Sequence, residues 1–567
     1  MSNYLTNNEA SGRATAKSRR KLWLASGVAG LTGVISLAAV GVAGSAGAVG
    51  LNWNTAQVSK DGDQHADEGR DWDQEQDKDK DKDKDKDKDK DKDKDKDKDK
   101  DRDKDHERGK EVPCDTDKLI QAIVFANNKH GGVLELAKGC TYNLSRNDYQ
   151  GNGLPVITEN ITLKGEHTTI AREATADYFR ILNVGAGGHL TIKGLTIKGG
   201  QTLERYNAVE PAAVWASYSD SEAIAAQVKA GTPLDQALTA RQANPKAGLT
   251  AAPKVTPKAA PAAANAGAVT PLVEYPEPTD GAGILVQPGG SAEIIESEVV
   301  LNQSGGNGGG VANFGTTKIW HSTVTRNTAF FFGGGVFNAG LLKVEESKIK
   351  DNTAIIGGGG ISNGAARIFA DDVDGGTVEL KKAEITDNET LGFGGGYLDI
   401  EGNTTAYETK FVSNTAVLAG GGLAAADSQL NLHNVSVERN STAGVGGGVA
   451  IAFDSAVTFE KSSIKDNTAG FFGGGLFNAF SVTTLRDSEV VGNRAIGPIG
   501  VGGGIFNIFG EVNLSKTKVA NNFSTFAPGG VFTFFGPVNV DDKSAITANR
   551  PTNCLAIPGG AIENCFA

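Results

Sequence analysis

The chain has 567 residues, a formal net charge of −12 and 75 glycines, while only 7% of its residues are aromatic. The acidic balance argues against nucleic acid as the main partner. Such a high glycine content with so few aromatic residues departs from the composition of ordinary globular domains, so internal repeats have to be sought before any other pattern.

Residues 1–50 are typical of an export segment. Basic residues precede a long uncharged run, and small residues at Ala46–Ala48 offer a site for signal peptidase. The run is longer than the ~7–15 residues of a signal-peptide core and approaches the ~20 residues of a membrane span. The sequence therefore predicts a secreted or cell-surface protein of a bacterial envelope, which contacts the membrane only if this segment remains uncleaved.

Residues 51–110 are predicted to form a disordered spacer. Aspartate occupies every odd position from Asp77 to Asp105, with Lys or Arg between. No apolar group is available for burial, so this tract should be solvated and extended. Its 29 residues reach at most roughly 100 Å, which suits a stalk that holds a folded region away from a membrane or wall.

Residues 111–200 are predicted to open the folded region. Leu119, Ile120, Ile123 and Val124 recur at helical spacing, and a strand follows in the stretch "VLEL". A short amphipathic helix at this point can cover the open end of a stack of strands.

The four cysteines fall into two local pairs. Cys114 and Cys140 flank the predicted helix, and Cys554 and Cys565 lie at the other end of the chain. In an exported protein this placement predicts two disulfides. The first would stabilise the cap by about 3 kcal/mol.

Residues 201–280 interrupt the strand pattern. The stretch "DSEAIAAQVKAGTPLDQALTARQAN" has helical character, and an Ala/Pro/Lys-rich stretch follows it. We interpret the whole as one long insertion in a regular fold. It is either a disordered loop with a marginal helix or a dedicated binding lid.

From residue 281 to 567 the chain repeats a short unit. Each unit has an apolar strand, an asparagine and a glycine cluster, as in "NTAFFFGGGVFN" and "NTAGFFGGGLFN". Short alternating strands at this spacing predict one turn of a β-solenoid per unit. The anchoring asparagines are Asn302, Asn327, Asn352, Asn388, Asn414, Asn440, Asn467, Asn493, Asn521 and Asn549.

Stacking explains why an asparagine would recur. In a parallel stack each position lies about 4.8 Å above its counterpart, so an asparagine can donate to one turn and accept from the next. We therefore expect a structural asparagine ladder. The glycines allow positive φ and close backbone approach. A phosphate-binding loop is not indicated, because neither a strand-to-helix context nor a GKS/T lysine accompanies them.

Two features resemble known families. "FVSNTAVLAGGGL" and "NCLAIPGGAIEN" are similar to the FxxN and GGAI motifs of the polymorphic outer-membrane protein family. The Cys/helix/"ANN…GG…L" opening resembles secreted actinobacterial proteins with the pectate-lyase-like fold. The resemblance covers about residues 111–200 and 281–567. It implies an all-β, right-handed parallel β-helix with an N-terminal helical cap. No autotransporter barrel is evident before Ala567, which favours a one-membrane envelope.

One group of carboxylates is a candidate site. Glu401, Asp427 and Asp454 each lie 13 residues before a ladder asparagine, so they should stack on three successive turns, with Asp399 nearby. Like charges about 5 Å apart repel, and Ca²⁺ would relieve that repulsion. The alternatives are solvated turn residues, since aspartate suits turns, or catalytic carboxylates. We assign no catalytic residue and expect no cofactor apart from this Ca²⁺.

The aromatic residues that precede the glycine corners allow two interpretations. They either form an internal stack or leave an exposed apolar contact strip for a protein or glycan. They are Phe330, Phe331, Phe332, Phe393, Phe471, Phe472 and Phe526.

Together these features favour a binding or adhesion surface for a cell-surface, wall, glycan or protein ligand over an enzyme. The alternative is a polysaccharide lyase or glycoside hydrolase, since β-helices of this class include pectin-cleaving enzymes as well as adhesins. A second alternative is a purely structural envelope protein.

Overall fold

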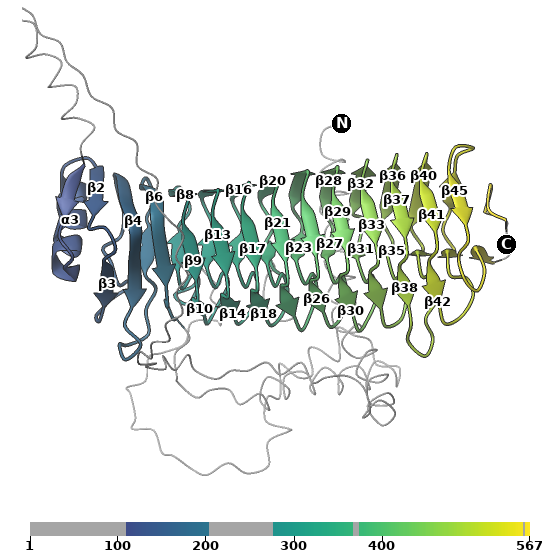
Figure 1. The fold of residues 1–567 in the computed structure, drawn as a ribbon, viewed down its shortest axis with the longest axis horizontal. Coiled ribbons are helices and arrows are strands. Elements are labelled where there is room, and N and C mark those ends of the chain that lie inside the picture. Colours follow the sequence, from purple (N-terminus) through teal and green to yellow (C-terminus); the bar gives the residue numbers. More distant parts are fainter. Residues whose placement is uncertain (1–108, 203–275, 367–372, 559–561, 567) are drawn as a thin grey trace, which may run out of the picture. The chain divides into compact units, whose positions relative to one another are not determined.

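The computed structural model describes residues 109–202, 276–366, 373–558 and 562–566, which form a parallel β-helix (Figure 1). The predicted export segment, the spacer apart from its last two residues and most of the 201–280 insertion lie outside the described residues. No helix within the described ranges is long and apolar enough to cross a membrane.

Each regular coil runs through three parallel sheets. Two consecutive strands belong to a 25-stranded sheet A, a two-residue strand to a nine-stranded sheet B, and a strand of three or four residues to a 12-stranded sheet C. Each strand pairs in parallel with its counterpart on the next coil, as Val311–Asn313 pairs with Val336–Asn338. This topology confirms the predicted all-β, right-handed parallel β-helix.

Sheet A contains the longest strands. They are β1 (Lys110–Val112), β2 (Gly132–Leu136), β3 (Thr141–Leu144), β4 (Asn160–Arg172), β6 (His189–Lys198), β8 (Ser291–Ile295), β9 (Glu298–Val300), β12 (Thr316–Trp320), β13 (Thr323–Thr325), β16 (Leu341–Glu345), β17 (Lys348–Lys350), β20 (Thr377–Lys381), β21 (Glu384–Thr386), β24 (Asn403–Tyr407), β25 (Lys410–Val412), β28 (Gln429–His433), β29 (Ser436–Glu438), β32 (Ala456–Glu460), β33 (Ser463–Lys465), β36 (Val482–Arg486), β37 (Glu489–Val491), β40 (Glu511–Ser515), β41 (Lys518–Ala520), β44 (Val538–Val540) and β45 (Ala545–Thr547).

Sheets B and C close each coil. Sheet B comprises β10 (Gln303–Ser304), β14 (Thr328–Ala329), β18 (Thr353–Ala354), β22 (Glu389–Thr390), β26 (Thr415–Ala416), β30 (Ser441–Thr442), β34 (Thr468–Ala469), β38 (Arg494–Ala495) and β42 (Phe523–Ser524). Sheet C comprises β5 (Leu182–Val184), β7 (Ile284–Val286), β11 (Val311–Asn313), β15 (Val336–Asn338), β19 (Ile361–Asn363), β23 (Tyr397–Ile400), β27 (Leu423–Ala426), β31 (Val449–Ala452), β35 (Leu476–Ala479), β39 (Ile505–Ile508), β43 (Val531–Phe534) and β46 (Cys554–Ile557).

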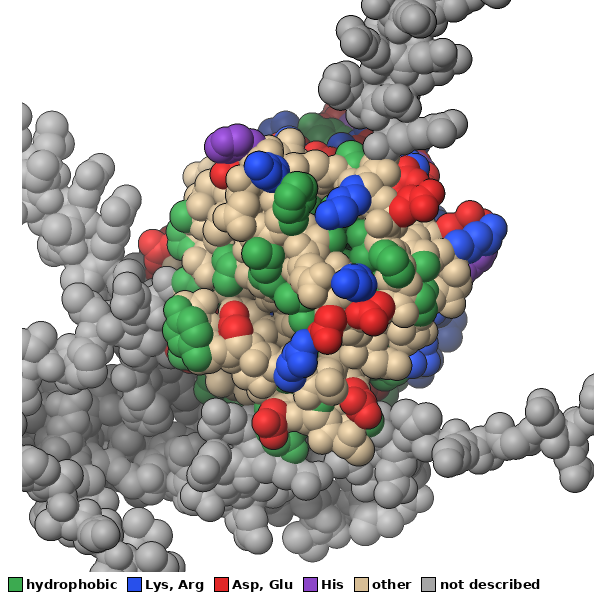
Figure 2. Space-filling model, turned by 90° about the vertical axis from the view of Figure 1, so that its left-hand side faces the viewer, with side chains coloured by type: hydrophobic (Ala, Val, Ile, Leu, Met, Phe, Trp, Pro, Cys, Tyr) green, Lys and Arg blue, Asp and Glu red, His purple; other side chains and the backbone are tan. Residues whose placement is uncertain are grey.

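The helix α3 (Thr116–Asn128) covers the first coils. The side chain of Asp115 caps it by accepting from the Lys118 backbone N–H at 3.0 Å. Its buried face differs by a small rotation from the expected one, because Ala122 and Ala126 are buried while Val124 is 45% exposed. On this end of the stack, hydrophobic, basic and acidic side chains are interspersed (Figure 2).

Both predicted disulfides are present, Cys114 with Cys140 beside the cap and Cys554 with Cys565 at the last coil. Disulfides of this kind indicate an oxidising compartment.

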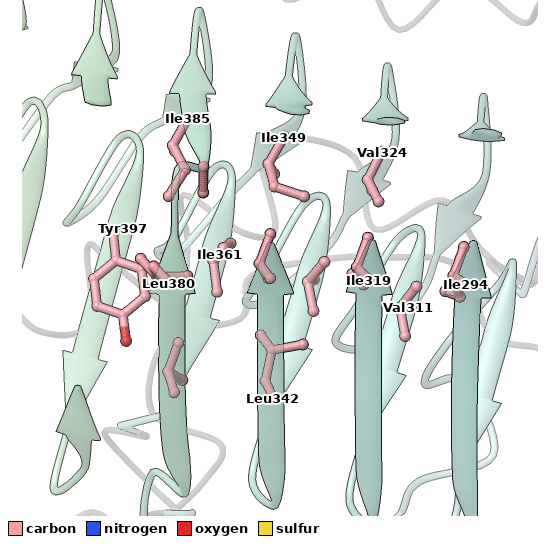
Figure 3. Packing of buried hydrophobic residues seen from close by; sticks show 14 of the residues in the cluster. Ile294, Val311, Ile319, Val324, Leu342, Ile349, Ile361, Leu380, Ile385 and Tyr397 are labelled. Atoms are coloured by element: carbon pink, nitrogen blue, oxygen red, sulfur yellow. The ribbon is translucent and has the colours of Figure 1, made fainter. Parts of the chain in front are cut away.

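The core consists of columns of identical or similar side chains. Ile294 lies against Ile319 in the register of sheet A, and Ile349 lies against Ile385 one strand further along the coil (Figure 3). All four are fully buried. Burial of such a side chain contributes about 1.5–3 kcal/mol, so each added coil extends the core by the same few contacts.

Asparagines form a continuous ladder at the corner between sheets A and B. Asn327 donates both its backbone N–H (3.0 Å) and its Nδ2 (3.1 Å) to Oδ1 of Asn352 on the next coil. Its Nδ2 also donates to the carbonyl of Val299 on the preceding coil at 2.9 Å. The arrangement repeats from Asn302 to Asn549, which joins neighbouring coils in a direction perpendicular to the strands.

One position predicted for this ladder is wrong. Asn522, not Asn521, accepts from Asn493 Nδ2 at 3.0 Å and donates to Asn549 Oδ1 at 2.9 Å. The residue before each ladder asparagine adopts the left-handed conformation, and Asn521 takes that place with φ +57°. Asparagine tolerates both positions, so the adjacent pair was ambiguous in sequence.

The glycine triplets are required by close approach. Gly333 has φ +69°. A Cβ on Gly334 would lie 2.4 Å from the Gly359 carbonyl oxygen, and one on Gly335 would lie 2.7 Å from that of Gly360. Any side chain here would force neighbouring coils apart, which explains why the triplet returns in each unit.

A serine ladder supports the bend inside sheet A. Ser322 Oγ accepts from the Ser297 backbone N–H at 3.0 Å, and Ser347 Oγ accepts from that of Ser322 at the same distance. The residues are buried, so these bonds satisfy backbone groups that the bend takes out of the strand pairing.

Replacing Asn467 by Leu should lower the free energy of unfolding by about 1–3 kcal/mol, because its buried partners on two coils lose their hydrogen bonds. Asn467 links Asn493 Oδ1 and the Val437 carbonyl. The measurement is the thermal unfolding midpoint, with Lys348→Ala as control. Lys348 is exposed and only forms a surface ion pair with Glu384. Equal midpoints for the two variants would contradict the role of the ladder.

Candidate functional site

The three predicted carboxylates lie at one corner on successive coils. Glu401, Asp427 and Asp454 follow the sheet C strands β23, β27 and β31, where the chain turns into sheet A. Glu401 N–H donates to the Ala426 carbonyl at 3.0 Å, and Asp427 N–H donates to that of Phe453 at 2.8 Å. All three residues adopt φ of +51° to +53°. The structure thus brings them into one row.

Burial decreases along these carboxylates. Glu401 and Asp427 are half-buried, while Asp454 is exposed. Across the described residues, no group of three or more His, Cys, Asp or Glu side chains has the arrangement of a metal site. The Ca²⁺ site at Glu401, Asp427 and Asp454 therefore stays a prediction.

Asp399 does not belong to this row. It points into the solenoid, where it takes the next place in a second amide ladder after Asn363, whose Nδ2 donates to it at 3.1 Å. Tyr397 and Ser428 donate hydroxyl hydrogen bonds to it at 3.2 Å, and Thr404 donates another. Complete burial raises the pKa of Asp399 to about 6, although these donors partly offset the effect. Asp399 is therefore an internal polar group rather than a surface ligand.

The same corner continues as a row of aromatic rings. Phe480, Phe509 and Phe535 occupy it on the next coils with φ of +50° to +53°. Their ring centroids are 5.1 and 5.7 Å apart and nearly parallel. The side chains remain 47%, 46% and 56% exposed. We call the six residues Glu401, Asp427, Asp454, Phe480, Phe509 and Phe535 the corner row.

Sequence reasoning missed the aromatic half of the corner row. Phe480 lies 13 residues before Asn493, which is the same spacing that selected the carboxylates. Phe509 has this spacing only from Asn522, so the wrong ladder position Asn521 concealed it.

The phenylalanines before the glycine corners have mixed environments. Phe332 and Phe393 are buried, whereas Phe526 is 55% exposed. The remaining predicted rings are half-buried, namely Phe330, Phe331, Phe471 and Phe472.

A polar groove lies at the bend of sheet A. It encloses about 520 Å³ and is lined by lysines, serines and two acids. Asp487 pairs with Lys516 at 3.5 Å, and Glu489 pairs with Lys465 at 2.5 Å. The bond to Glu489 raises the pKa of Lys465. Both acids of this groove are thus held in ion pairs, an arrangement suited to polar contact rather than proton transfer.

Comparisons with known proteins add little about activity. No family model and no curated protein matches the chain. Among solved structures, the A-module of the mannuronan C-5 epimerase AlgE6 from Azotobacter vinelandii is similar, with 12% sequence identity and a TM-score of 0.26. The match covers 81% of this chain and 99% of that one. Membership of the polymorphic outer-membrane protein family stays a prediction.

Replacing Asp399 by Asn should stabilise the protein at pH 7.5. A carboxyl whose pKa rises from 3.8 to about 6 on folding favours the folded state below pH ~4, and that contribution is lost as the pH rises through 6. Two pH units correspond to about 3 kcal/mol, so the gain should approach this value at pH 7.5 and be much smaller at pH 4.5. Denaturant unfolding at both pH values is the measurement. A variant with the parent's pH dependence would contradict the assignment.

Proposed function

We propose that this protein is exported and displays its β-helix as a binding or adhesion surface for a cell-surface, wall, glycan or protein ligand. The observation that carries the proposal is the corner row, in which acidic and then aromatic side chains project from one edge on consecutive coils. The two disulfides fit an extracellular location.

Stability alone does not account for the aromatic half of this row. A bulky residue in the left-handed region costs roughly 1–2 kcal/mol relative to ordinary backbone. Phe480, Phe509 and Phe535 bear this cost while about half of each side chain faces solvent. Asn or Gly would relieve the strain at the same corner. Strained, exposed apolar residues are a feature of contact surfaces.

The repeat spacing also favours binding. Equivalent side chains on successive coils recur about every 4.8 Å, so the row offers several similar contacts to one extended or repetitive ligand. Individually weak contacts can then add to useful affinity.

The second candidate is a polysaccharide lyase or glycoside hydrolase. The stacking of Glu401, Asp427 and Asp454 at one corner favours it, because glycosidases act through paired carboxylates and lyases through Ca²⁺-binding ones.

Replacing Phe480, Phe509 and Phe535 together by Asn should reduce adhesion to cells, wall material or a glycan array about ten-fold or more, since clustered aromatic contacts dominate such interfaces. The thermal unfolding midpoint should not fall, because Asn is better tolerated at positive φ. Unchanged adhesion would contradict the proposal.

The matched control replaces Glu401 by Gln and both Asp427 and Asp454 by Asn. It should retain adhesion, and the parent should release no oligosaccharide from pectin-like or envelope polysaccharides in the presence of Ca²⁺. Release by the parent that is lost in this variant, with an unchanged fold, would establish the enzyme. A parent that neither binds nor cleaves would favour a structural envelope protein.

A further inference from the structure

The outer face of sheet C is apolar where a solvated face is expected to be polar. In strands β23, β27 and β31, Tyr397, Leu423 and Val449 face the core. The next residues, Leu398, Ala424 and Ala450, lie in register and face outward. Parallel strands that are apolar on both faces are normally covered on both faces.

Side-chain size forms a hollow on this face. Ala424 and Ala450 make its floor, and bulkier side chains bound it on either side along the solenoid axis. We call this hollow the trough, and it is lined chiefly by Phe393, Leu398, Ala424, Ala450, Phe453 and Phe477. All six are buried, at 4–8% exposure. The hollow itself encloses about 40 Å³.

The trough has an acidic side. Glu401 and Asp427 follow directly after Ile400 and Ala426, which also line it. Asp454 continues the same side on the next coil. An occupant that combines apolar side chains with basic ones would match both the hollow and this charge.

The chain's own insertion has this chemistry. Residues 219–258 lie outside the described residues, and their sequence carries apolar residues such as Ile224, Val228, Leu234 and Leu238. Residues 236–258 contain four basic side chains and no acidic one. The basic residues are Arg241, Lys246, Lys254 and Lys258. We propose that residues 219–258 dock in the trough.

The points where the insertion leaves and re-enters the solenoid allow this. Thr202 Oγ1 donates to the Thr279 carbonyl at 2.5 Å, and Arg180 donates to the Asp280 carbonyl at 2.7 Å, so both ends are held together. Five coils separate β7 from β27, a distance of about 24 Å along the axis. The 16 residues before segment 219–258 and the 17 after it can each span roughly 50 Å.

Limited trypsin digestion of the full chain tests the proposal. Docking should slow cleavage after Arg241 and Lys246, because proteolysis follows the population of the open state. Ala424→Trp fills the trough floor and should increase the cleavage rate at these sites about ten-fold or more. Asn431→Trp is the matched control, since Asn431 is exposed in β28 on sheet A of the same coil, and it should keep the parent's rate.

A second variant guards against misfolding of the first. Asp427→Lys reverses the charge at the side of the trough without filling it, and it should also increase cleavage. Equal rates in the parent and in both variants would overturn the proposal. A parent that sediments as a dimer, becomes monomeric in Ala424→Trp and shows no change in cleavage would identify a second copy of the chain as the occupant, which also overturns it.

Discussion

The structure depends on one constraint, the in-register stacking of each coil on the next at about 4.8 Å. Parallel pairing of the strands provides most of it, and the asparagine ladder fixes the corner where strand pairing stops. Because each asparagine serves two neighbours, one local rule is repeated along the whole stack. The glycine triplets follow from the same rule, since any Cβ there would separate adjacent coils.

Sequence patterns predicted the fold well because the fold is itself a repeat. The asparagine spacing, the alternating strands and the cysteine pairs each reflect contacts between adjacent coils, so a single chain displays them many times. Ambiguity arose where two neighbouring residues fit neighbouring roles, as with Asn521 at the left-handed corner and Asn522 in the ladder. The serine ladder was missed because serine is also common on exposed surfaces.

The candidate site was less predictable, because the direction of a side chain at a corner depends on one residue of register. Asp399 and Glu401 are two positions apart, yet the first lies inside the solenoid and the second on its outer corner. The aromatic half of the corner row needed the correct ladder position before its spacing became regular. The outer face of sheet C could not be distinguished from the core, since both are apolar.

A stack of equivalent coils has no intrinsic length, because each new coil presents the same free strand edges as the last. Such edges invite pairing with another chain, as in amyloid growth. Here α3 covers one end. At the other, Cys565 is bonded to Cys554 and bridges to Ile546, while Asn564 Nδ2 donates to the Val540 carbonyl at 2.9 Å. The folded tail thus acts as a chain terminator, and the disulfides make a self-templating architecture finite.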